Sequence, residues 1–304
     1  MCHVDRRPNL RKAEQKSDEH KSLAKVVPRA ILCGDPTFAR LVKDNMPFLY
    51  LFLLAGGVIL VMMTLLWLLS LRLQNSSIVD IFWGLGFITV TWLAFALTPQ
   101  GYLPRKILIS VLVTIWGLRL ALHIGLRNRG KPEDFRYANW RTEHGERWWW
   151  FSFVQVFLLQ GFLMWLIGAP LIAAQTSGFP AILTPLDVLG ALVWLLGFTF
   201  EAIGDAQLAR FKADPASKGK LYTAGLWKFT RHPNYFGEAV LWWGFYLIAL
   251  AAGRWWTVFS PVLMTYLLIK ISGVVMLERT MKRRPGYEDY MRRTRAFFPW
   301  LPKS

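Results

Sequence analysis

The sequence predicts an all-α protein that crosses a membrane about seven times. Hydrophobic residues make up 54% of the 304 residues, charged residues make up 18%, and the mean hydropathy is +0.31. Soluble domains carry about a quarter charged residues. Several apolar stretches reach about 20 residues, the length that a helix needs to cross a hydrocarbon layer about 30 Å thick. Because backbone groups in lipid must be paired internally and no stretch alternates as barrel strands do, we expect helices.

Each apolar stretch is expected to form one spanning helix. The seven stretches are 47–70, 78–98, 106–126, 149–174, 184–208, 237–252 and 255–277. No internal repeat or Gly/Ser linker divides them, so residues 46–304 are predicted to be one transmembrane domain. Residues 1–45 have no apolar core of a signal peptide and are expected to be a basic tail, disordered or peripheral.

Positively charged residues predict the orientation. Lys and Arg gather in the expected loops 127–148 and 210–236 and in the tail after residue 278, whereas the expected loop 175–183 is nearly uncharged. The positive-inside rule puts the basic side in the cytoplasm and explains the net charge of +17 without a nucleic-acid partner. The two cysteines, Cys2 and Cys33, lack the spacing of a metal site and cannot build a disulfide framework.

Ionisable residues inside the apolar stretches are the first functional candidates, because each costs several kcal/mol unless it has a partner or a wet cavity. Asp80 lies just inside the second stretch, one turn from Trp83. One interpretation is an acid that complements the helix dipole. The other, equally weighted, is a buried carboxyl group that donates a hydrogen bond to a substrate carbonyl.

Two further sets of charges recur at helical spacing. Arg119, His123 and Arg127 form one stripe along the third helix, where Arg119 is too deep to reach the interface and needs an acidic or anionic partner. Glu201 and Asp205 lie one turn apart in the fifth stretch, and their repulsion must be relieved by cations, with Arg119 or the C-terminal segment as candidates. A structural ion network and a cofactor-facing site are both consistent with this pattern. For His123, a satisfied buried histidine competes with a catalytic role.

The segment from Lys218 to Glu238 carries the most specific pattern. The His232–Pro233 step is extended, and Pro suits the first position of a helix. That helix N-terminus, preceded by Arg231, offers N–H groups and positive potential to an anion such as pyrophosphate. Asn234 and Glu238 lie one turn apart and present an amide and a carboxylate, which suit a carboxamide or ribose hydroxyls better than phosphate.

The stretch Arg-His-Pro-Asn-Tyr-Phe-Gly-Glu at 231–238 resembles the C-terminal signature of the steroid 5-alpha-reductase superfamily, and the chain resembles its bacterial branch of unknown function. Residues 80–84, 127–137, 278–290 and 298–299 support the resemblance, which covers about 47–302. It implies seven helices around NADPH in the inner membrane, with the cofactor side cytoplasmic. It also implies reduction of a carbon–carbon double bond conjugated to a ketone in an apolar, lipid-like substrate, such as a steroid or another enone.

The polar residues inside the apolar stretches give the expected catalytic residues, which are Asp80, Trp83 and His123. Most of the expected cofactor contacts are carried over by position from the resemblance. The expected cofactor contacts are Arg119, Asn128, Arg129, Lys131, Glu201, Asp205, Lys212, Arg231, His232, Asn234, Tyr235, Glu238, Glu278, Arg279 and Lys282. No metal is expected, and no GxGxxG motif indicates a Rossmann domain.

The chain departs from the steroid-reducing members at one point. Those members grip the ketone with a Gln-Glu pair on the second helix and a Tyr on the third, and neither is found here. Their absence counts against a steroid substrate and leaves hydride donation from NADPH unaffected. An S-adenosylmethionine (SAM)-dependent membrane methyltransferase, of the kind that acts on isoprenylcysteine or phospholipid, is the alternative, since those enzymes share an Arg-His-Pro-x-Tyr step. A transporter ranks third, because no inverted repeat is visible.

Overall fold

The computed structural model describes residues 36–271 and 273–303, with side chains from Phe48 onward. The expectations for 1–35, including those for Cys2 and Cys33, lie outside these residues. The contacts divide the chain into two units, Met1–Leu49 and Tyr50–Ser304, and the fold and site below belong to the second. Residues 36–45, which belong to the expected tail, are helical.

Every regular element in the described residues is helical, which confirms the predicted fold class. The α-helices are α2 (Pro36–Leu73), α3 (Phe82–Leu97), α4 (Leu103–Asn128), α5 (Phe135–His144), α6 (Trp148–Ser152), α7 (Leu159–Ile167), α8 (Ala169–Ala173), α9 (Pro185–Ala213), α10 (Pro233–Ala251), α11 (Phe259–Tyr266), α12 (Val274–Met281) and α13 (Tyr287–Arg293). Short 3-10 helices are η1 (Ser76–Ile81), η2 (Gly145–Arg147), η4 (Pro215–Ser217), η5 (Gly225–Lys228) and η6 (Trp255–Val258). Two segments are π-helical. The first, η3 (Phe153–Leu158), joins α6 to α7, and the second, η7 (Leu267–Ile271), follows α11.

Six helical stretches within the described residues are long and apolar enough to cross a membrane. They are Phe48–Leu73, Ser76–Leu97, Leu103–Asn128, Phe135–Ile167, Pro185–Ala213 and Trp255–Met281. The remaining predicted span, 237–252, is the helix α10, whose first turns carry Asn234 and Glu238 and whose middle is largely buried. The chain is therefore an integral membrane protein. Its helix α10 is largely buried and carries polar residues in its first turns.

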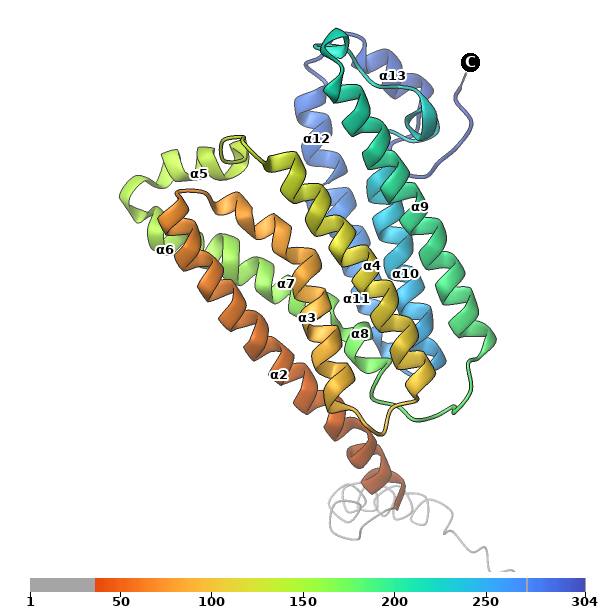
Figure 1. Cartoon of the computed structure of the whole chain (residues 1–304). Coiled ribbons are helices and arrows are strands. Elements are labelled where there is room, and N and C mark those ends of the chain that lie inside the picture. The colour runs from red at the N-terminus through yellow and green to blue at the C-terminus, as the bar shows by residue number, and fades with distance from the viewer. Residues whose placement is uncertain (1–35, 272, 304) are drawn as a thin grey trace, which may run out of the picture. The chain divides into compact units, whose positions relative to one another are not determined.

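The basic segments lie together. Figure 1 shows the C-terminal ends of α4 and α9, with α12 and α13, at one end of the second unit, while the connections from α3 to α4 and from α8 to α9 lie at the other. The three regions rich in Lys and Arg thus share one side, as the loop charges predict.

Close packing of α9 against α10 positions the site. A Cβ at Gly237 would lie 2.4 Å from both the Glu201 nitrogen and the Gly197 oxygen, so glycine is required for this approach. The same holds between α3 and α4, where a Cβ at Gly84 would lie 2.2 Å from the Gly117 oxygen. Because α9 and α10 touch backbone to backbone, the acids of α9 lie directly against the first turns of α10.

One local structure differs from the sequence expectation. Residues 127–148 were expected to form a loop, but they contain α5, whose N-cap Asp134 accepts a hydrogen bond from the Arg136 N–H. Asp80 lies near the start of the span Ser76–Leu97, as expected, in the 3-10 helix η1 that precedes α3. Charged side chains from η1 and α5 therefore lie next to each other.

Candidate functional site

A cluster of charged side chains lies between α4 and α9. The Arg119 guanidinium donates to Glu201 Oε1 and to Asp205 Oδ2, each at 2.5 Å. Trp116 Nε1 donates to Glu201 Oε2 at 3.0 Å, and His123 Nε2 lies 3.5 Å from Asp205 Oδ2. The stripe on α4 therefore meets the acid pair on α9, and Arg119 is the cation that relieves their repulsion, as one of the sequence alternatives expects.

The first turns of α10 extend this cluster. The helix begins at Pro233, which confirms the extended His232–Pro233 step, and Asn234 Nδ2 donates to Asp205 Oδ1 at 3.1 Å. The Asn234 Oδ1 atom is buried and has no hydrogen-bond partner. The Glu238 carboxylate lies within electrostatic range of Glu201, Asp205 and Arg119, and it forms no hydrogen bond or ion pair with any residue that the structure describes. Two unpaired acceptors therefore stand one helical turn apart.

Cations lie at the basic end of the same region. Lys212, near the end of α9, is exposed, and the charges of Arg127, Lys131 and Arg284 all act on it, with Asp205 as the opposing charge. Within the described part of the chain, Lys131, Lys212 and Arg284 form no ion pairs. These side chains produce positive potential without protein counter-ions, which favours an anionic ligand.

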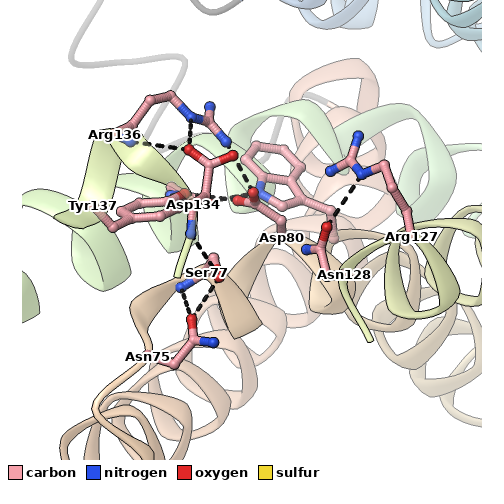
Figure 2. A network of polar contacts seen from close by, with 10 residues as sticks. Asn75, Ser77, Asp80, Arg127, Asn128, Asp134, Arg136 and Tyr137 are labelled. Atoms are coloured by element: carbon pink, nitrogen blue, oxygen red, sulfur yellow. Dashed lines mark hydrogen bonds and ion pairs between the residues drawn. The ribbon is translucent and has the colours of Figure 1, made fainter. Parts of the chain in front are cut away.

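Asp80, the expected catalytic acid, lies in a second polar network, shown in Figure 2. Its two carboxylate oxygens accept hydrogen bonds from Tyr137, at 2.7 Å, and from Arg136, at 3.0 Å. Gln160 links this pair to Trp83, because it donates to the Tyr137 hydroxyl at 3.1 Å and accepts from Trp83 Nε1 at 2.7 Å. Asp80 and Trp83 are thus connected through two residues, and Asp80 acts as an acceptor toward the protein.

Paired charges anchor this second network. Burial alone would raise the pKa of Asp134, but hydrogen bonds from Arg136 hold that pKa below its usual value. Glu133 accepts from Arg141 and from the Ser76 N–H, which ties α5 to η1. Arg136 is therefore shared between two carboxylates, Asp80 and Asp134, and is fixed at the edge of α5 (Figure 2).

Tyr235 connects the two networks electrostatically. The charges of Glu238 and Asp205 from the first network and of Arg136 and Arg127 from the second all act on its hydroxyl. That hydroxyl forms no hydrogen bond with the described residues. The Tyr235 hydroxyl is therefore a donor without a hydrogen-bond partner among the described residues, and charges from both networks act on it.

Three other predicted cofactor contacts hold the C-terminal segment. Arg231 donates to Glu278 Oε1 at 2.8 and 2.6 Å and to the carbonyls of Met291 and Thr294. His232 Nε2 lies 3.3 Å from the same Glu278 oxygen. The Arg231 guanidinium and the Glu278 carboxylate are therefore bonded to each other, and this clamp holds α12 and α13 against the start of α10. Arg279 and Lys282 are exposed on this segment.

The remaining predicted contacts lie apart from the acid cluster. Asn128 and Arg129 line a cavity between α4 and η1, together with apolar side chains. Sequence reasoning did not single out Arg136, Tyr137 and Gln160. Gln160 is a polar residue inside the stretch 149–174, a signal that could have been found. Arg136 and Tyr137 could not be, because their partner Asp80 is 56 and 57 positions away.

Comparison with known proteins adds the family. Residues 66–294 match the family described as "Protein of unknown function (DUF1295)". The chain belongs to the DUF1295 family. This family includes steroid 5-alpha-reductase-like proteins. The match contains both polar networks and most of the helices that carry them.

Two relatives are similar to this DUF1295 protein. The uncharacterised protein C594.04c of Schizosaccharomyces pombe is 26% identical over 91% of this chain and 86% of its own length. The probable O-methyltransferase ustE of Ustilaginoidea virens is 33% identical over 73 residues, which are 24% of this chain and 26% of that protein. No solved structure matches.

Proposed function

We propose that this DUF1295 protein is a membrane-embedded, NADPH-dependent reductase that acts on the carbon–carbon double bond of an apolar enone. The observation that carries the proposal is the pair of unpaired acceptors, Asn234 Oδ1 and the Glu238 carboxylate, in a cluster whose other members are bonded. A buried acceptor without a donor costs about 1–3 kcal/mol. A ligand that supplies N–H groups removes this cost, and the carboxamide of nicotinamide is such a group.

The surrounding charges fit the rest of a dinucleotide. Lys212 and the cations around it, Arg127, Lys131 and Arg284, repel one another, and phosphates would relieve this repulsion. The C-terminal ends of α4 and α9, which carry Arg127 and Lys212, lie at the end of the second unit where the basic segments gather (Figure 1). With the positive-inside rule, this end is the cytoplasmic side, where NADPH is available.

The protein's own groups can stabilise negative charge that develops on a substrate carbonyl. When bound, NADPH supplies a hydride to the conjugated double bond. The Tyr235 hydroxyl is a donor that forms no hydrogen bond with the described residues, and a donor of this kind stabilises a developing enolate. Asp80 fixes Arg136 and Tyr137 through its two carboxylate oxygens, so we assign it a positioning role rather than direct contact with the carbonyl.

A SAM-dependent methyltransferase is the second candidate. The similarity of 73 residues to a probable O-methyltransferase favours it. The acid cluster also carries more negative than positive charge, because Arg119 is its one arginine or lysine beside the three acids Glu201, Asp205 and Glu238. Such an excess of negative charge suits a sulfonium ion. The unneutralised cations around Lys212 distinguish the two, because SAM lacks phosphates.

An enone panel tests the proposal. Purified protein in detergent is incubated with NADPH and lipid-soluble enones, and NADPH consumption is followed together with methyl transfer from SAM. We expect NADPH oxidation that falls about 10- to 100-fold in Glu238→Gln, the loss of one hydrogen bond to a charged group. Glu288→Gln, which changes an exposed acid on α13, serves as the matched control and should keep full activity. Methyl transfer without NADPH oxidation would refute the reductase and establish the alternative.

A further inference from the structure

A cavity of about 380 Å³ lies between η1 and the last turns of α4, outside the acid cluster. It shares no residue with the Arg119, Glu201, Asp205, Asn234 and Glu238 cluster. One part of its wall consists of apolar side chains, and the other part, at the basic end of α4, consists of polar side chains. The lining residues are Asn75, Ser77, Ile78, Ile81, Ala121, Leu122, Gly125, Leu126, Asn128 and Arg129.

The apolar part of the wall includes exposed leucines of the membrane-spanning helix α4. Leu122 and Leu126 are 63% and 60% exposed, although they belong to the span Leu103–Asn128. Gly125 lies between them, and a Cβ added there would meet no atom within 4 Å. This part of the cavity is therefore open and apolar, and it can accommodate hydrocarbon without any rearrangement.

The polar part offers donors. Asn75 Oδ1 already accepts from the Ser77 N–H and hydroxyl, which leaves its amide nitrogen available. Asn128 Oδ1 accepts from Arg127 Nε, so its amide nitrogen is likewise available, as Figure 2 illustrates. Arg129 forms no ion pair within the described part of the chain. Groups that only donate are complementary to an anion or to carbonyl oxygens.

Neighbouring acids do not neutralise this part of the cavity. Asp80 and Asp134 are both bonded to Arg136. Glu133 is bonded to Arg141. The nearby carboxylates thus already have cations, and the charges of Arg127 and Arg129 are left over at the end of the molecule where basic segments gather.

We propose that this cavity binds one anionic phospholipid. The phosphate lies against Arg129 and the Asn75 and Asn128 amides, and an acyl chain lies along Leu122, Gly125 and Leu126. A lipid fits better than a free phosphate because the greater part of the lining is apolar, and basic pockets between membrane helices attract anionic headgroups. This assignment differs from the cofactor role expected for Asn128 and Arg129, and it does not depend on the proposed reductase activity.

Native mass spectrometry of the full chain, released from mild detergent after equilibration with phosphatidylglycerol or phosphatidylcholine, tests the proposal. We expect one phosphatidylglycerol per chain in the wild type. Gly125→Phe fills the apolar part, and Arg129→Gln removes the charge. Arg129→Gln should reduce the phosphatidylglycerol adduct about tenfold or more, the effect of losing a charged contact. Gly125→Phe should also reduce it, because the phenyl ring occupies the place of the acyl chain. Phosphatidylcholine should bind more weakly to the wild type and respond little to Arg129→Gln.

Gly57→Phe is the matched control. Gly57 is an exposed glycine of α2, and a Cβ there also meets no atom within 4 Å. This variant should keep the lipid, and the thermal unfolding midpoints of the variants should match that of the wild type. Equal phosphatidylglycerol binding by Gly125→Phe and the wild type would overturn the proposal. Displacement of the lipid by inorganic phosphate alone, or by NADPH one for one, would equally overturn it, because the site would then be a general anion site or part of the cofactor site.

Discussion

Replacing Arg119 by methionine removes the cation that holds the acid cluster together. Its side chain is 18% exposed, while the side chains of Glu201 and Asp205 are 3% and 10% exposed. Breaking a buried ion pair by removing one partner costs about 3–5 kcal/mol. Because Arg119 is partly exposed, we take the lower end, about 3 kcal/mol. At about 2 °C per kcal/mol for a chain of this size, the unfolding midpoint should fall by about 6 °C.

Thermal unfolding of the purified protein in detergent, followed by tryptophan fluorescence, measures this shift. The control is Arg210→Met, because Arg210 is exposed on α9 and forms no ion pair within the described residues. It should change the unfolding midpoint by less than about 2 °C, as expected for a surface charge.

A rescue variant separates charge from packing. Glu201→Gln and Asp205→Asn in the Arg119→Met background remove the uncompensated carboxylates, so most of the lost stability should return. If Arg119→Met unfolds at the wild-type temperature, or if neutralising the two acids restores nothing, the account of this cluster is wrong.

Three further predictions concern packing and pH. In Gly237→Val, the added Cβ would lie 2.4 Å from the Glu201 backbone nitrogen. The variant should therefore separate α9 from α10 and abolish NADPH binding in a titration. Arg105→Met leaves Asp187 buried without its bonded cation and should cost about 3–5 kcal/mol in thermal unfolding, whereas an unchanged midpoint would contradict this. Burial raises the pKa of Tyr287 to about 12 from about 10 when unfolded, so its contribution to stability is present below pH 10 and lost as the pH rises toward 12. Unfolding midpoints across this range should therefore fall more steeply in the wild type than in Tyr287→Phe, and parallel curves would refute it.

Much of the fold follows from hydropathy, because burial in lipid demands long apolar helices whatever their tertiary contacts. Six predicted spans are found as helices long and apolar enough to cross a membrane. The exception, 237–252, corresponds to α10, whose role depends on its packing against α9 rather than on its own composition. Helix α5 was missed since its charged residues are read as a loop until their partners are known.

The candidate site was partly predictable for the same reason. Regular spacing placed Arg119 and His123 on one face, Glu201 and Asp205 on another, and Asn234 and Glu238 at the start of a helix, and each relation is found in the structure. Contacts between residues from distant segments could not be predicted from the sequence. The bond between Asp80 and Tyr137, and the clamp of Arg231 on Glu278, both depend on tertiary packing.

Direct binding of NADPH is the sharpest test of the central claim that Asn234 and Glu238 hold a nicotinamide carboxamide. Dissociation constants for NADPH and SAM are measured by tryptophan-fluorescence titration of wild type, Glu238→Gln and Glu288→Gln. We expect the wild type and Glu288→Gln to bind NADPH alike, Glu238→Gln to bind it about 10- to 100-fold more weakly, and SAM not to compete. NADPH affinity that is unchanged in Glu238→Gln, or SAM binding that alone depends on Glu238, would contradict it.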